Sequence, residues 1–127
     1  MTMKPGGAGM SRIIPILRMF DEGKTKEFYI DFLEFGIDWE HRFDDDAPLY
    51  MQVSSGPCAL HLSEHFGDGS PGAAIRIEMA DIESFHAKLL AKGYKHARPG
   101  LEKTPWSTAE CTIQDPAGNK IIFYENL

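Results

Sequence analysis

The sequence predicts an α+β fold: two βαβββ modules in tandem form a curved, cupped mixed sheet with helices on its outer face. The first observation is that one order of strand-like and helix-like segments occurs twice in the 127 residues. The second is the spacing, because Met19 and Asp21 recur 60 residues later as Met79 and Asp81. A repeat of this length that occurs only twice indicates two fused copies of one module rather than a solenoid.

The first module is expected at residues 11–65. Asp21 suits a helix N-cap, aromatic residues follow it at helical spacing, and Gly36 suits the helix end. The expected segments are a strand at 13–19, a helix at 22–35, and strands at 37–43, 49–53 and 58–63. Strict alternation in the second strand places Ile37 and Trp39 on one face and Asp38 on the other.

The second module is expected at residues 73–127, after a linker at 66–72 that is rich in Gly. Its expected segments are a strand at 73–79, a helix at 82–92 with Asp81 as N-cap, a short strand at 94–98, and strands at 109–114 and 120–125. The last two strands flank Asp115-Pro116-Ala117-Gly118-Asn119. In this turn Asp can bond the backbone two residues on, Pro fixes φ, and Gly takes a left-handed position.

Composition indicates a single domain at residues 11–127, preceded by a flexible arm at 1–10. The apolar fraction of 43% and the charged fraction of 25% are ordinary for a globular protein. No apolar run approaches 18 residues, and the N-terminus lacks the apolar middle of a secretion signal, so we expect a cytoplasmic protein without a membrane partner. Cys58 and Cys111 are expected as free thiols rather than a disulfide.

The net charge of −6 disfavours nucleic-acid binding, because no basic stripe is present to replace the counterions of phosphates. An acidic protein suits a cationic small ligand better. Solubility alone also explains an acidic composition.

Alternation along the strands predicts which side chains meet the helices and which line the concave face. The expected helix-facing set is Leu17, Met19, Leu60, Leu62, Ile75, Ile77, Met79, Ile121 and Phe123. The expected concave set is Ile14, Ile16, Arg18, His61, Ser63, His65, Ala74, Arg76, Glu78, Ile122 and Tyr124. An ion pair between Glu78 and an arginine is the simplest interpretation of the charges in this set.

The chain resembles the vicinal-oxygen-chelate superfamily, which contains glyoxalase I, extradiol dioxygenases, thiol transferases and bleomycin-resistance proteins. The resemblance rests on Asp21 with Phe28-Tyr29, on Asp81 with its helix, and on the turn at 115–119, and it covers residues 12–126. Pro105-Trp106 and the segment from Leu60 to His65 are similar to the bleomycin-binding branch in particular.

The resemblance implies four metal-ligand positions on the concave face of the enzymes, and here they hold Ile14, His61, Ala74 and Ile122. Three of these side chains supply no metal donor. We therefore expect no metal and no cofactor, although His65 or Glu78 could take part in a different site.

The resemblance to the bleomycin-resistance branch implies a two-fold homodimer that holds a cationic aromatic drug in clefts between subunits. Trp106 corresponds to the family's stacking tryptophan, and Phe43, or Tyr50 in its place, is the candidate for the opposite face. Asp44, Asp45 and Asp46 form either an acidic lip or only a solvated turn. The candidate ligand-binding residues are Arg18, Phe43, Tyr50, His61, Ser63, His65, Trp106 and Tyr124.

Three functions follow from these residues. The first is a non-catalytic protein that confers resistance by sequestering a bleomycin-like drug. The second is a glyoxalase-like lyase or isomerase with an altered metal site, in which His61 and His65 act as acid or base. The third is a protein that binds an unrelated metabolite, because one fold serves many functions.

Overall fold

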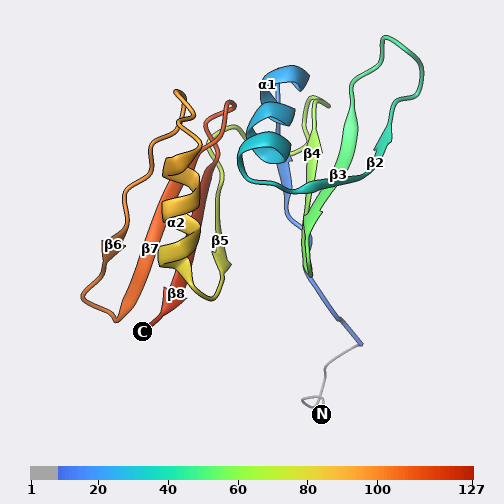
Figure 1. The fold of residues 1–127 in the computed structure, drawn as a ribbon. Helices are drawn as coiled ribbons and strands as arrows, with labels where there is room; N and C mark the ends of the chain where they lie inside the picture. The colour runs from blue at the N-terminus through green and yellow to red at the C-terminus, as the bar shows by residue number, and fades with distance from the viewer. Residues whose placement is uncertain (1–8) are drawn as a thin grey trace.

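The computed structural model describes residues 9–127, so most of the arm expected at 1–10 lies outside the described residues. The elements are β1 (Ile16–Arg18), α1 (Glu22–Lys26), η1 (Glu27–Phe32), β2 (Gly36–His41), β3 (Tyr50–Ser55), β4 (Cys58–Ser63), β5 (Ala74–Glu78), α2 (Ile82–Ala91), β6 (Glu102–Lys103), β7 (Thr108–Gln114) and β8 (Lys120–Asn126). The expected α+β class is confirmed, and the βαβββ order occurs twice (Figure 1).

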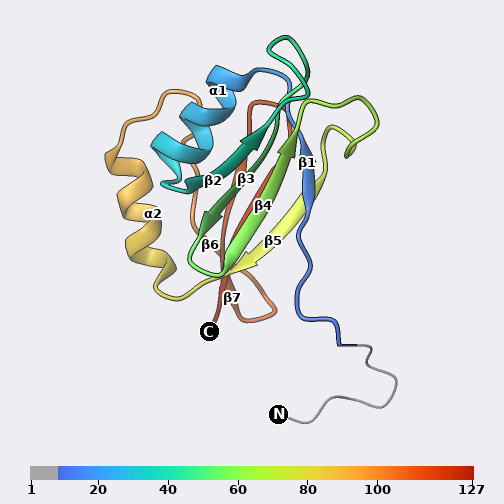
Figure 2. The same cartoon turned by 90° about the vertical axis from the view of Figure 1, so that its right-hand side faces the viewer.

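Each module forms its own four-stranded mixed sheet, in the orders β1-β4-β3-β2 and β5-β8-β7-β6. β1 pairs in parallel with β4 and β5 with β8, while the remaining pairs are antiparallel. No pairing joins the two sheets within the described strands, so the surface expected as one curved sheet consists of two sheets (Figure 1). Both helices lie along one side of the strands (Figure 2).

One apolar core joins the two modules. It contains the helical residues Phe28, Tyr29 and Leu89 together with inward side chains of both sheets. The expected helix-facing set is confirmed, since its members are either fully buried or packed against this cluster. Burying a side chain of this kind stabilises a fold by about 1.5–3 kcal/mol relative to exposure.

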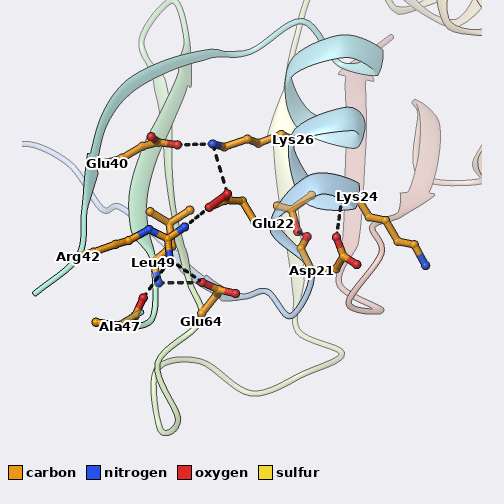
Figure 3. Close-up of polar contacts among 10 residues, drawn as sticks. Asp21, Glu22, Lys24, Lys26, Glu40, Arg42, Ala47, Leu49 and Glu64 are labelled. Atoms are coloured by element: carbon orange, nitrogen blue, oxygen red, sulfur yellow. Dashed lines mark hydrogen bonds and ion pairs between the residues drawn. The ribbon is translucent and has the colours of Figure 1, made fainter. Parts of the chain in front are cut away.

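Ion pairs fasten α1 to β2 and to the loop that follows β2 (Figure 3). Asp21 caps the helix as expected, because its Oδ1 accepts a 2.9 Å hydrogen bond from Lys24 N. Lys26 pairs with Glu40, and Arg42 pairs with Glu22. Glu40 of β2 and Arg42 just after it therefore point toward the helix.

The second helix does not use the expected cap. Asp81 has a φ of 55° and makes no side-chain capping bond. The two carboxylate oxygens of Glu125 instead accept hydrogen bonds from Asp81 N at 3.0 Å and from Ile82 N at 3.1 Å. A carboxylate from β8 thus satisfies the free N–H groups that begin α2.

The strand expected at 94–98 is also wrong. Residues 94–97 form a turn in which Ala97 N bonds to Tyr94 O at 3.3 Å, and the short strand of this region is β6. Tyr94 packs instead against Phe32, with ring centroids 4.8 Å apart. Tertiary packing overrides the strand propensity of this short segment.

The turn at 115–119 forms as expected. Asp115 Oδ1 accepts hydrogen bonds from Ala117 N at 2.9 Å and Asn119 N at 2.8 Å, and Gly118 has a φ of 88°. Cys58 and Cys111 are free thiols. None of the helices between residues 9 and 127 is long and apolar enough to cross a bilayer.

Candidate functional site

The side of the first sheet away from the helices carries an aromatic and polar cluster. We call it the first-sheet face, and its residues are Trp39, Tyr50, Gln52 and His61. Trp39 stacks on Tyr50 with centroids 5.9 Å apart and planes within 9°, and it also packs edge-on against His61. Trp39 is 42% exposed and Tyr50 is half-buried, so the stacked pair reaches the surface through Trp39.

A β-bulge in β2 builds this face. Ile37 pairs with Val53 and Trp39 with Gln52, so the register shifts by one residue at Asp38. Ile37 therefore lies on the side of buried Val53, whereas Trp39 lies on the open side, and the expectation that both share a face is wrong. A bulge leaves one residue unpaired and re-aims its neighbours.

Four side chains of this region form a hydrogen-bonded row, which we call the polar chain. Asp38 Oδ2 lies 2.9 Å from Gln52 Nε2, Gln52 Oε1 lies 2.9 Å from His61 Nε2, and His61 Nδ1 lies 2.7 Å from Tyr50 Oη. The ionised carboxylate can only accept, so it fixes the orientation of the Gln52 amide. Gln52 Oε1 then requires an N–H on His61 Nε2.

The electrostatics agree with a neutral His61. Burial, followed by the charge of Arg12, lowers the pKa of His61 below its ordinary value. Hydrogen bonds from Gln52 and Ser54 lower the pKa of Asp38, which keeps this carboxylate ionised. In neutral His61 the Nδ1 atom is an acceptor, so Tyr50 donates its hydroxyl hydrogen to it.

The neighbouring candidate residues bond chiefly to one another. Arg18 Nη1 donates to the backbone oxygen of His65, and the Arg18 guanidinium lies 5.1 Å from the centre of the Phe20 ring. Ser63 is fully buried, and its hydroxyl donates to Asp68 Oδ2 at 2.9 Å. These contacts hold the end of β4 and the start of the linker beside the first-sheet face.

Phe43 stands apart from this cluster. Its ring is 81% exposed and packs edge-to-face against His41, with centroids 5.2 Å apart. Asp44, Asp45 and Asp46 follow it in an exposed loop.

The second sheet carries a separate cluster on its open side, which we call the second-sheet face. It consists of Arg76, Trp106, Glu110 and Tyr124. Arg76 Nη2 lies 2.9 Å from Glu110 Oε2, and its guanidinium lies 4.3 Å from the centre of the Tyr124 ring. Glu110, rather than the Glu78 considered from sequence, is the partner of this arginine.

Trp106 is the most exposed member of the second-sheet face, at 66%. It follows Pro105 in a tight turn in which Ser107 has a φ of 63°. Its Nε1 atom donates to Glu110 Oε2 at 3.3 Å, which orients the indole. Hydrogen bonds from Arg76, Thr108 and Trp106 lower the pKa of Glu110 to about 2.

The candidate residues therefore form two groups within one chain. Tyr50 and His61 belong to the first-sheet face, whereas Trp106 and Tyr124 belong to the second-sheet face. Among the described residues no aromatic ring stacks on Trp106, and the partner of Tyr50 is Trp39.

The donor set does not fit the metal of the family's enzymes. Ile14, Ala74 and Ile122 supply no donor atom, and both ring nitrogens of His61 are engaged in the polar chain. No three His, Cys, Asp or Glu side chains between residues 9 and 127 form a group that could hold a metal ion.

Sequence reasoning missed Trp39, Asp38, Gln52 and Glu110. The bulge that turns Trp39 toward His61 and Asp38 toward Gln52 has no signal in the sequence of β2. Glu110 lies directly opposite Tyr124 in the pairing of β7 with β8, so correct strand register would have found it.

Comparison with known proteins decides the family. A family model described as "Glyoxalase superfamily protein" matches residues 1–127. The chain belongs to the glyoxalase superfamily. A search of curated proteins found no match.

Several solved structures share the fold. An antibiotic-binding protein, TnmS3 from Streptomyces sp. CB03234, is 20% identical with a TM-score of 0.70, and the match covers 94% of this chain and 98% of that one. A bleomycin resistance determinant encoded on transposon Tn5 is 22% identical with a TM-score of 0.72, covering 92% and 98%. A glyoxalase family protein from Enterococcus faecalis is 16% identical with a TM-score of 0.72, covering 92% and 98%.

Proposed function

We propose that this protein is a non-catalytic binding protein of the cytoplasm, which sequesters a bleomycin-like, cationic aromatic small molecule and so confers resistance. The observation that carries the proposal is the stacked pair of exposed Trp39 and half-buried Tyr50 on the first-sheet face. A planar aromatic ligand gains about 0.5–1.5 kcal/mol per ring pair beyond the area it buries.

The charge around the stacked pair favours a cation. The carboxylate of Asp38 stands at the end of the polar chain, and Asp44, Asp45 and Asp46 occupy the exposed loop between β2 and β3. The net charge of −6 adds a long-range attraction for cationic ligands.

The proposal includes a two-fold homodimer. The first-sheet and second-sheet faces are separate within one chain, and each leaves an aromatic side chain in solvent: Trp39 is 42% and Trp106 66% exposed. Ile16, which pairs with His61 of the first-sheet face, is 43% exposed. A two-fold dimer that sets the first-sheet face of one subunit opposite the second-sheet face of the other would form two ligand clefts. In each cleft Trp106 of one subunit would face Tyr50 or Phe43 of its partner.

The chemistry of the donor set supports binding over metal-dependent catalysis, since only one of the four family ligand positions carries a donor. A solved structure of a bleomycin-binding protein with bleomycin, 22% identical over 93% of this chain, has a TM-score of 0.71. This relative motivates the choice of ligand for the test.

The experiment is a titration of the purified protein with metal-free bleomycin, in which tryptophan fluorescence reports binding. Trp39 and Trp106 are the two tryptophans of the chain, so Trp39→Phe and Trp106→Phe each leave one reporter. We expect saturable quenching of both reporters, because the ligand would contact both faces.

Two results would change the proposal. No fluorescence change at tens of micromolar bleomycin would exclude this class of drug, and native mass spectrometry of protein from its own cells would then search for a metabolite. A stoichiometric metal bound through His61 would instead favour a lyase or isomerase of this fold.

A further inference from the structure

The hydroxyl of Tyr50 has a fixed polarity. The row from Asp38 through Gln52 to His61 runs in one direction, because a carboxylate has no hydrogen to donate. Tyr50 is at the end of this row, and its only hydrogen is directed to His61 Nδ1 at 2.7 Å. The remaining lone pairs of Tyr50 Oη can only accept.

From this geometry we infer that Tyr50 Oη selects ligands that present an N–H donor, such as a primary ammonium, beside the aromatic ring that covers the Trp39–Tyr50 pair. This inference rests on the proposed function and narrows its ligand class. A ligand that offers a carbonyl or carboxylate oxygen at this point would face a second acceptor and lose the contact.

The charges around Tyr50 reinforce the same choice. Asp68 lies close enough that its negative charge, after burial, raises the pKa of the Tyr50 hydroxyl, so the phenol stays neutral. The Asp68 carboxylate accepts a hydrogen bond from the Ser63 hydroxyl and has no hydrogen to donate to Tyr50. The charged groups beside the polar chain are Asp68 in the linker, which acts on Tyr50, and Arg12 before β1, which acts on His61.

Asp38 acts here as a positioning residue. If its side chain could also donate, the Gln52 amide would be free to turn over. His61 would then take its other tautomer and donate from Nδ1 to Tyr50, and the hydroxyl hydrogen would point outward. The Asp38→Asn variant has this property, and it changes the ligand preference of Tyr50 without touching Tyr50 itself.

Two matched cations test the inference. 2-Naphthylmethylammonium and its N,N,N-trimethyl analogue carry the same ring and the same charge, but only the first has N–H donors. Binding is measured by isothermal titration calorimetry with wild type, Tyr50→Phe, Asp38→Asn and the control Tyr94→Phe. Tyr94 lies against Phe32 and His96, away from the polar chain.

We expect wild type and Tyr94→Phe to prefer the primary ammonium by about tenfold, as for one hydrogen bond to a charged donor. We expect the ratio of dissociation constants to fall to about one in Tyr50→Phe and to an intermediate value in Asp38→Asn. Because both ligands carry the same charge, the loss of a carboxylate alone leaves this ratio unchanged.

The outcomes separate the two proposals. Equal binding of both cations to wild type, or an unchanged preference in Tyr50→Phe, would overturn the inference and leave the proposed function standing. Failure of wild type to bind either cation would overturn the ligand class of the proposed function, and this inference with it.

Discussion

Tyr29 Oη donates a 2.7 Å hydrogen bond to Asp115 Oδ2, although the two residues are 86 positions apart in the chain. Tyr29 belongs to the helical segment of the first module, and Asp115 begins the last turn of the second. Both side chains are buried, and the bond raises the pKa of Tyr29 further than burial alone. One carboxylate therefore shapes a turn and also joins the two modules.

Replacing Asp115 should destabilise the whole chain. Asp115→Ala leaves the Tyr29 hydroxyl and the Asn119 N–H buried without their partner, and we expect a loss of about 3–5 kcal/mol in the free energy of unfolding. Tyr29→Phe removes one donor and should cost about 1.5–3 kcal/mol. Urea unfolding monitored by circular dichroism measures both, and a change below 1 kcal/mol for Asp115→Ala would contradict the role.

Gly69 should tolerate no side chain. Its φ is 68°, and a Cβ there would lie 2.8 Å from Ile16 O and 3.1 Å from Arg18 N, so Gly69→Ala must displace the linker from β1. We expect the free energy of unfolding to fall by about 2–4 kcal/mol, because the steric overlap adds to the cost of a side chain at positive φ.

Gly72→Ala is the matched control for this position. Gly72 also has a positive φ of 81°, but nothing lies within 4 Å of its Cβ position. Gly72→Ala should therefore lower the free energy of unfolding only by the cost of placing Ala at positive φ, about 1 kcal/mol. Equal losses in the two variants would show that the linker does not depend on contact with β1.

The stability of the protein should depend on pH through His61. Its folded-state pKa is lowered, so the unfolded chain binds this proton more readily, and stability falls as pH drops below about 6.5. The loss stops once the folded state also takes up the proton. His61→Gln should flatten this part of the stability curve relative to wild type, and urea midpoints between pH 5 and 7.5 test the difference.

The two thiols should react slowly in the native protein. Burial raises the pKa of Cys111 to about 11 and raises that of Cys58, so neither forms much thiolate at pH 8. We expect iodoacetamide to label both within minutes in urea but to label the native chain far more slowly, with Cys111 the slower. Rapid native labelling of Cys111 would contradict its burial.

Trp106→Ala should weaken binding of metal-free bleomycin by about 1–3 kcal/mol, one to two orders of magnitude in the dissociation constant. Unfolding by urea should change little, since Trp106 is 66% exposed.

The protein should be a dimer in solution. Light scattering after size-exclusion chromatography should give twice the chain mass of 14.2 kDa. A monomeric mass at the concentration of the titration would exclude a cleft between subunits.

Much of the fold follows from the sequence because it depends on local patterns. The helix and strand patterns that repeat after 60 residues, the Asp21 cap and the turn at 115–119 each rest on neighbouring residues, and all three are present in the structure. Alternation also placed the core-facing residues of the strands correctly. Asp81 failed as a cap because its competitor, Glu125, arrives from a strand 44 positions away.

The candidate sites were only partly predictable, because the partners of their residues come from segments that are distant in the chain. Alternation placed His61 on the side away from the helices, but the partners of His61 and Tyr50 depend on register. A one-residue bulge at Asp38 brings Trp39 to His61 and Asp38 to Gln52, and the pairing of β7 with β8 brings Glu110 to Arg76. Nothing local in the sequence encodes either alignment.

The sequence by itself determined the order of elements and its repetition, since these are properties of residue type and spacing. The absence of donor side chains at Ile14, Ala74 and Ile122 can also be read from the sequence, at positions that the family resemblance implies. Only the tertiary structure decided that the strands form two sheets, that Trp39 stacks on Tyr50, and that the polar chain ends in an acceptor. Register, bulges and hydrogen-bond direction arise between segments that are distant in the chain, so they exist only once the chain has folded.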